Sequence, residues 1–507
     1  MALATEKDLS NREFDLLVVG GGIVGSGVAR DAAMRGLATA VIDKQDFASG
    51  TSSRSSRLLH GGIRYLAQGN IGLVREASRE KMVIHKIAPH LSDPLAFIFP
   101  THKRSTWSLW KLGIGVKVYD LLCGRRNLGK STVLNRKQIL ELLPGLQTSN
   151  LSGAVRYFDG ITNDARLTVD TLRSACNHGA SVTNYVRFID AHQENDIWRC
   201  ELQNTTTNVS YEIHAKCVIN ATGPWSHNLP HSKTSLRLTK GVHLVIDRSR
   251  LPVPDAVVFA EGSRILFAIP WGERVILGTT DTDYDGPIDS PRCEPEDQQY
   301  VLDVVNEAFP AVGLSNQDVL STWAGLRPLV ADKHGNPSDI SRRHEIKMSH
   351  PGWWDVTGGK LTSYRLMAEE TVDAVAHFLR PSIEPCRTAT TPLLETPNSI
   401  HVSGILPPEV SEAAVEHYCN QEWAVHLDDV MIRRTSWRYY HSDHMSIARI
   451  VADWMGNFLG WSDVAMNREL SHYEMLAESG KVPPPHFNNS LNGNPSILSR
   501  EDTYSKS

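Results

Sequence analysis

Residues 14–25 read FDLLVVGGGIVG, an apolar strand that runs into three glycines and then into a helical pattern. A second apolar strand, residues 38–42, follows that helix. A strand, a glycine turn, a helix and a second strand in this order are typical of the βαβ unit that opens dinucleotide-binding folds. The stretch therefore predicts an α/β protein with a Rossmann-like nucleotide site near its N-terminus.

Three glycines and one acid give this unit its chemistry. Gly20, Gly22 and Gly25 take the G-x-G-x-x-G spacing. The first glycine permits the tight turn, the second lets the backbone approach a pyrophosphate, and the third lets helix and strand pack closely. Asp43 ends the second strand, where a carboxylate can accept hydrogen bonds from an adenosine ribose. The plainer interpretation, a tight turn in an ordinary α/β fold, leaves the register of strand, helix and acid unexplained.

The cofactor is predicted to be FAD without nicotinamide. The chain has one glycine fingerprint, whereas a flavoenzyme that also held NAD(P)H in a separate domain would carry a second. Residues 220–225, Asn-Ala-Thr-Gly-Pro-Trp, end a strand with a small turn. This turn resembles the one that passes close to the flavin in proteins of the D-amino-acid-oxidase type. Ala221, Gly223 and Trp225 are therefore candidate FAD contacts.

Composition excludes several classes of protein. The chain has 507 residues, of which 41% are hydrophobic and 21% charged, enough to bury more than one core. A net charge of -5 without a basic stripe argues against a nucleic-acid partner. Seven scattered cysteines without a C-x-x-C pair favour a reducing compartment. The sequence shows no signal-peptide core and no apolar run of about 18 residues, so we expect a cytoplasmic protein without a membrane span.

No metal site is expected. Residues 281–286 begin like a calcium-binding loop, but the twelfth position is Arg292, where a bidentate glutamate should stand. His441 and His444 are close in sequence, yet no further histidine or cysteine at metal-ligand spacing accompanies them.

The order of elements predicts a composite fold. Strand-like runs between residues 212 and 278 alternate with loops, a helical run follows Gly359, and helical periods dominate from about residue 392. We predict an α/β, D-amino-acid-oxidase-type FAD-binding fold with a mixed β-sheet substrate domain and a helical C-terminal domain. The expected ranges are 1–390 for the oxidoreductase region, 391–485 for the helical domain and 486–507 for a disordered tail. Within the first range, FAD-binding parts (12–100, 150–240, 330–385) interleave with substrate-domain parts (100–150, 240–330).

Four sequence blocks resemble a known family. Residues 51–66 read TSSRSSRLLHGGIRYL, and three later blocks follow in the same order as in that family. The later blocks are IPW at 269–271 with GTTD at 278–281, AGLRPL at 324–329 and GGKLTSYR at 358–365. Together with Arg433-Arg434-Thr435 near the C-terminus, they are similar to FAD-dependent glycerol-3-phosphate dehydrogenases. Two departures are the absence of a calcium-loop extension and Asp43 where a glutamate is common.

The resemblance implies an activity. It implies oxidation of sn-glycerol 3-phosphate to dihydroxyacetone phosphate by hydride transfer from C2 to FAD, with electrons passed to a membrane quinone. A related oxidase that reduces oxygen and a non-catalytic FAD-binding protein are the alternatives. Hydrogen peroxide production distinguishes the first, and damage to the catalytic residues would indicate the second. The sequence does not determine the oligomeric state, and a homodimer stays a hypothesis.

The resemblance also implies roles for particular side chains. His60 is the candidate base for the hydroxyl proton, Arg327 is a catalytic and phosphate-binding cation, and Lys360 stabilises the flavin or the substrate. Further substrate contacts are Arg64, Tyr65 and Arg342. Further FAD contacts are Thr51, Ser52, Ser53, Gly62, Gly359, Lys360, Leu361 and Thr362. The plainer roles are a structural histidine, surface ion pairs for the arginines, core packing for the tyrosine and turn caps for the serines.

The segment 103–126 mixes apolar side chains with flanking lysines and arginines. Such a composition suits a helix that lies in a membrane interface, although the sequence alone slightly favours a helix packed on the core of its own protein. The resemblance favours peripheral association with the inner face of the cell membrane.

Overall fold

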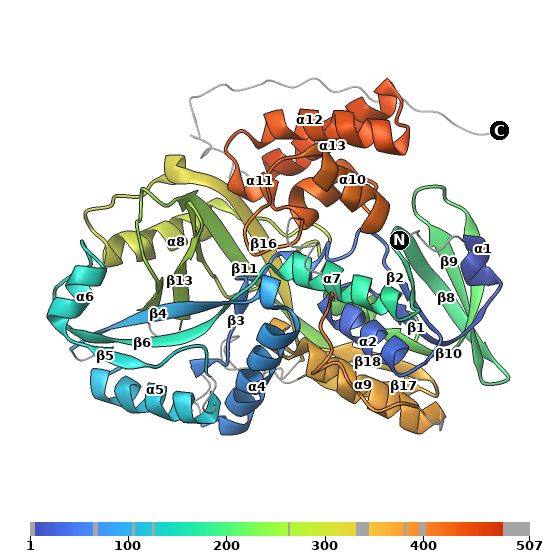
Figure 1. The fold of residues 1–507 in the computed structure, drawn as a ribbon, viewed down its shortest axis with the longest axis horizontal. Helices are drawn as coiled ribbons and strands as arrows, with labels where there is room; N and C mark the ends of the chain where they lie inside the picture. The colour runs from blue at the N-terminus through green and yellow to red at the C-terminus, as the bar shows by residue number, and fades with distance from the viewer. Residues whose placement is uncertain are drawn as a thin grey trace, which may run out of the picture.

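The computed structural model describes residues 6–63, 69–103, 107–123, 127–261, 264–330, 344–379, 383–394 and 402–479. It contains two large sheets that lie side by side, with a group of helices from the C-terminal region above them (Figure 1). This architecture confirms the predicted D-amino-acid-oxidase-type fold with mixed sheets and a helical C-terminal domain.

The first sheet is built around β1 (Glu13–Val19), which pairs in parallel with β2 (Thr39–Ile42) and β10 (Ser210–Asn220). Its strand order is β17-β18-β10-β1-β2-β7, and β9 and β8 extend it from β10. The remaining strands are β7 (Ser181–Thr183), β8 (Val186–Glu194), β9 (Ile197–Asn204), β17 (Glu345–His350) and β18 (Trp353–Thr357).

Both faces of β1 are covered, which explains its continuous apolar sequence. Leu16 and Val18 pack against α2 (Ile23–Met34), α7 (Asp164–Asn177) and α9 (Tyr364–Leu379). Leu17 and Val19 face the other side, where Trp198 lies in a core formed by β8, β9 and β10. The predicted βαβ unit is thus confirmed, with α2 beginning directly after the glycine turn.

The second sheet has the order β15-β11-β14-β13-β12-β4-β6-β3, with β16 paired to β11 and β5 to β6. Its strands are β3 (Leu58–Leu59), β4 (Asp93–His102), β5 (Thr132–Leu134), β6 (Leu151–Ile161), β11 (Leu236–Asp247), β12 (Ala256–Glu261), β13 (Arg264–Trp271), β14 (Arg274–Gly278), β15 (Thr282–Asp283) and β16 (Val319–Val330). The helices α6 (Arg136–Leu142) and α8 (Pro295–Ala308) pack on one core of this sheet. The helices α4 (Ile71–Ile87) and α5 (Leu109–Cys123) pack on another. Between the two sheets the chain crosses several times, so each sheet is assembled from distant segments.

The C-terminal helical region, residues 402–479, contains α10 (Glu412–Gln421), the π-helix η9 (Asp429–Arg434), α11 (Trp437–Tyr440), α12 (His444–Leu459) and α13 (Asp463–Ser479). It has a core of its own. Drawn in orange to red in Figure 1, these helices lie above α7 and β16, at the end of the molecule opposite α5. Short elements complete the described chain: α1 (Glu6–Ser10) and the 3-10 helices η1 (Thr51–Ser53), η2 (Pro89–Leu91), η4 (Gly223–Asn228), η5 (Asn316–Asp318) and η7 (Leu361–Ser363).

Among the described residues, no helix combines the length and the apolar character that a bilayer span requires.

Candidate active site

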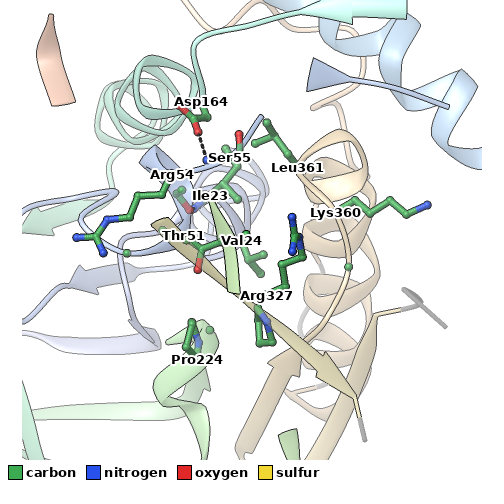
Figure 2. A pocket seen from close by; sticks show the side chains of 18 of the residues that line it. Ile23, Val24, Thr51, Arg54, Ser55, Asp164, Pro224, Arg327, Lys360 and Leu361 are labelled. Atoms are coloured by element: carbon green, nitrogen blue, oxygen red, sulfur yellow. Dashed lines mark hydrogen bonds between the residues drawn. The ribbon is translucent and has the colours of Figure 1, made fainter. Parts of the chain in front are cut away.

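A cavity of about 870 Å³ lies between the two sheets. Its wall is formed by the turn between β1 and α2, the segment 43–62, the turn after β10, strands β11 and β16, and the turn after β18. This volume is within the range of cofactor sites, which span about 300–1,000 Å³. Figure 2 shows lining residues from these separate segments around one space, with the side chains of Arg54 and Lys360 extending outward from it.

The glycine turn leaves the end of α2 open to the cavity. Gly20 has a φ of 108° and lies so close to the next strand that a Cβ there would be 2.7 Å from the Ala221 carbonyl oxygen. A Cβ on Gly25 would be 1.9 Å from the Gly20 carbonyl oxygen. Gly25 therefore packs inside the turn, away from the cavity wall. Ser52 Oγ accepts the Ile23 N–H at 2.9 Å, which joins the segment 51–53 to the first turn of α2.

Asp43 lies at the same end of the cavity. Its carboxylate accepts hydrogen bonds from the Gly21 N–H at 2.8 Å and the Gln45 N–H at 3.0 Å, so it holds the glycine turn as well as facing the cavity. Burial raises the pKa of Asp43 to about 6. A carboxylate has about four lone-pair sites, which leaves acceptor capacity for ribose hydroxyls. The glycine cradle, the helix N-terminus and this acid fit the adenosine diphosphate half of FAD.

Two further turns, at residues 60–62 and 358–361, meet at the cavity wall. The His60 N–H donates to Thr362 Oγ1 at 3.1 Å, and Thr362 Oγ1 donates to the His60 carbonyl at 3.3 Å. Thr362 thus braces His60 and does not line the cavity. Gly62, Gly358 and Gly359 have φ values of 75°, 72° and 81°, a backbone region that favours glycine. These glycine turns form part of the cavity wall, next to His60 and Lys360.

A buried polar cluster holds the glycine after His60. The Gly61 N–H donates to Tyr119 Oη at 2.9 Å and is 3.3 Å from Asp159 Oδ1. Asp159 also accepts a hydrogen bond from Tyr119 and forms an ion pair with Lys81 at 2.8 Å. Helices α4 and α5 therefore position the loop that carries His60.

Arg327 is held at the cavity wall by β16 and its neighbours. It donates to Thr279 Oγ1 at 2.9 Å, and its Nη1 lies 3.2 Å from both the Thr280 carbonyl and Asp281 Oδ1. A Cβ on Gly241 of β11 would be 2.3 Å from Arg327 Nη2, so the guanidinium lies across a glycine. Asp281, the first residue of the segment weighed as a calcium loop, is thus an ion-pair partner of Arg327.

Lys360 also lines the cavity. It precedes η7 and is part of the turn after β18. In Figure 2 its side chain extends away from Arg327.

His243 is a site residue that sequence reasoning missed. It lies on β11 and lines the cavity, its Nε2 is 2.8 Å from Ser56 Oγ, and its ring stacks on Trp323 with centroids 5.2 Å apart. Burial, with the nearby charges of Arg327 and Arg57, lowers the pKa of His243 to about 3. The imidazole is therefore neutral at physiological pH. The available signal was its position as the one polar residue within the apolar run 242–246.

The structure brings most of the predicted site residues together. The cavity wall includes Gly20, Gly22, Asp43, Thr51, Ser52, His60, Gly62, Ala221, Gly223, Trp225, Arg327, Gly359, Lys360 and Leu361. Gly25, Ser53 and Thr362 lie behind the wall, where they pack or brace the turns. Arg64, Tyr65 and Arg342 lie outside the described residues. Arg54, which was not singled out from the sequence, also lines the cavity.

Comparison with known proteins points to one family. The family model of FAD dependent oxidoreductases (DAO) matches residues 15–374. The aerobic glycerol-3-phosphate dehydrogenase of Staphylococcus aureus is 40% identical over 409 residues, which cover 76% of this chain and 73% of the relative. The enzyme of the same name from Staphylococcus haemolyticus is 39% identical over 412 residues, covering 78% and 74%.

Solved structures agree in fold. The glycerol-3-phosphate dehydrogenase of Bacillus halodurans, complexed with FAD, has a TM-score of 0.76 and 30% identity, covering 94% of this chain and 97% of that one. The L-alpha-glycerophosphate oxidase of Mycoplasma pneumoniae, with FAD bound, has a TM-score of 0.58 and 16% identity, covering 76% and 100%, a likeness in fold alone. The predictions of the cofactor and of the enzyme class are confirmed. The chain belongs to the FAD dependent oxidoreductase family, in the part of that family that includes the aerobic glycerol-3-phosphate dehydrogenases.

Proposed function

We propose that this protein oxidises sn-glycerol 3-phosphate to dihydroxyacetone phosphate and passes the electrons to a membrane quinone. The observation that carries the proposal is the placement of Arg327 and His60 on the same cavity as the glycine turn and Asp43. A small dianionic alcohol needs a cation for its phosphate and an acceptor for its hydroxyl proton. The names of the relatives support this choice of substrate.

FAD is assigned along the length of the cavity. Its pyrophosphate would be held by the N-terminus of α2 near Gly22 and Ser52, and its ribose by Asp43. The ring system would be held by the backbone of Gly62 and of the turn 359–361. When bound, FAD accepts the hydride that leaves C2 of the substrate.

The side chains then have separate tasks. Arg327 binds the phosphate through charge-assisted hydrogen bonds, and the substrate resemblance adds Arg64, Tyr65 and Arg342 to this set. His60 takes the proton of the C2 hydroxyl. Lys360, whose side chain extends away from Arg327, is assigned to the flavin rather than to the phosphate. Neutral His243 adds no positive charge beside Arg327, so it serves as a polar wall and not as a further anion-binding group.

A surface on α5 suits the membrane. Trp110, Ile114 and Leu121 on this helix are 65%, 58% and 79% exposed, and Lys111 and Lys117 stand among them. Exposed apolar side chains beside lysines are typical of helices that lie in the interface of anionic membranes. The opposite face of α5 is buried, and its Tyr119 reaches Gly61 next to His60. We therefore place α5 against the inner face of the cell membrane, where the protein could pass electrons to a quinone in the bilayer.

The test is product formation with a quinone analogue. Purified protein, glycerol 3-phosphate and the analogue should yield dihydroxyacetone phosphate, and Arg327→Met should lose most of this activity while still holding FAD. If the analogue is not reduced and hydrogen peroxide forms in air instead, the acceptor is oxygen and the quinone part of the proposal is wrong. If no ketone forms with either acceptor, the substrate assignment is wrong.

A further inference from the structure

The C-terminal helical region touches the loop that follows the ribose-binding acid. This loop, residues 43–48, begins at Asp43 and continues from the end of β2. Asp46, at its centre, is fully buried. Its carboxylate accepts hydrogen bonds from Arg434 Nη1 at 2.7 Å and Nη2 at 2.8 Å, and from Arg433 Nε. Both arginines end the π-helix η9, so the loop is tied to the C-terminal region by a bidentate ion pair.

An aromatic contact joins the same two parts. Phe47 meets Trp423 of the C-terminal region edge to face, with ring centroids 5.4 Å apart. On its other side Phe47 covers the glycine turn, since a Cβ on Gly21 would be 2.3 Å from Phe47 Cδ1. Phe47 therefore lies between Trp423 and the turn, and Gly21 in turn donates its N–H to Asp43.

One amide connects the ionic and the aromatic contacts. Asn184 Nδ2 donates to Asp46 Oδ1 at 3.1 Å and to the Trp423 carbonyl at 2.9 Å. Asp46, Phe47 and Trp423 therefore form a continuous set, and every member of it is buried. The loop cannot move relative to the C-terminal region without breaking several of these contacts.

Stability alone is a poor explanation for this arrangement. Although burial by itself would raise the pKa of Asp46, the guanidinium groups of Arg434 and Arg433 hold it well below its usual range. Burying such charges has a large desolvation cost, and apolar side chains of similar volume would hold two elements together equally well. What the ion pair adds is geometry, because a guanidinium fork fixes the direction of the carboxylate it binds.

We propose that the C-terminal helical region is part of the FAD site, with Arg433, Arg434 and Trp423 acting as positioning residues for the loop 43–48. They keep Asp43 and the Gly21 backbone in the orientation that receives the adenosine end of FAD. The proposal rests on FAD binding in the cavity and not on the identity of the substrate.

The test measures FAD release from full-length holoenzyme after dilution, followed by the rise of flavin fluorescence in the absence of substrate. Arg434→Lys keeps the charge but loses the fork, and we expect release at least about tenfold faster, as the loss of a charged hydrogen bond implies. Trp423→Leu should also accelerate FAD release. Trp423→Phe keeps an aromatic edge against Phe47 and should release FAD at close to the wild-type rate.

Arg274→Lys is the control. Arg274 of β14 also ties the body of the protein to the C-terminal region, because its Nε donates to the Tyr440 carbonyl at 2.7 Å, and it lies outside the loop 43–48. It should lower the thermal unfolding temperature while leaving FAD release unchanged. If Arg274→Lys accelerates release as much as Arg434→Lys does, or if Arg434→Lys and Trp423→Leu both release FAD at the wild-type rate, the C-terminal region has only a structural role and the proposal is overturned.

Discussion

Gly241→Ala should impair catalysis by displacing Arg327. The new Cβ would be 2.3 Å from Arg327 Nη2, 2.7 Å from its Cζ and 2.6 Å from Thr279 Oγ1, so the guanidinium must move by about 1 Å to reach ordinary contact distance. It lies at the end of a flexible side chain, and the φ of Gly241 is not in the left-handed region, so the strand itself can accept alanine. A displacement of about 1 Å at a binding group can lower kcat/KM by up to about 100-fold.

The assay is kcat/KM for glycerol 3-phosphate with a quinone analogue, together with the flavin content of the purified variant. We expect a fall of about 10- to 100-fold with normal flavin content, because the phosphate contact is lost and the FAD contacts are not. Gly72→Ala is the control, since a methyl group there meets nothing within 4 Å. A Gly241→Ala variant within about twofold of wild type would refute the assignment of Arg327 to the phosphate.

Three further predictions concern charge and surface. The proposed ribose contact needs the ionised form of Asp43, whose pKa is raised by burial to about 6. FAD release should therefore accelerate as pH falls from 7.5 to 5.5, whereas Asp43→Asn should release FAD rapidly at both pH values. His243 has a pKa of about 3 in the folded protein, below its value of about 6.5 in the unfolded chain. Its contribution to stability is therefore full above about pH 6.5 and is lost as pH falls toward 3. The free energy of unfolding should fall by up to about 1.4 kcal/mol per pH unit in this range. The unfolding temperature of His243→Phe should accordingly fall less steeply with acidification than that of the wild type. Leu121→Glu should reduce sedimentation with anionic vesicles, whereas Val464→Glu, at an equally exposed position on α13, should not, and equal effects would remove the case for α5 as the membrane contact.

Most of the fold could be predicted from short-range sequence patterns. The βαβ unit could be predicted because its strand, turn and helix are adjacent in sequence and each follows a short-range rule. The strand-like runs expected between residues 212 and 278 fall on β10, β11, β13 and β14, and the helical periods expected from about residue 392 fall on α10, η9, α12 and α13. The strand β12 and the short helix α11 were not anticipated. The π-helix at 429–434 could not be anticipated, because the helical period there does not reveal which hydrogen-bond register the packed helix adopts.

The site was predicted less completely, for a physical reason. The motif in sequence identified Arg327 as a candidate. The position of its guanidinium, however, depends on the pairing of β16 with β11, which brings Gly241 next to it. The neutrality of His243 depends on Arg57 and Arg327, which are distant in sequence. Thr362 was predicted as a cofactor contact from its motif, whereas its hydrogen bonds with the His60 backbone could not be predicted. Such roles arise from long-range contacts that no local pattern encodes.

The most direct test of the central claim is anaerobic mixing of the yellow holoenzyme with sn-glycerol 3-phosphate while the visible flavin absorbance is followed. We expect rapid bleaching, because the hydride from C2 reduces the bound FAD, and recovery of the absorbance when a quinone analogue is added. A holoenzyme that demonstrably holds FAD but does not bleach with glycerol 3-phosphate would contradict the proposed reaction.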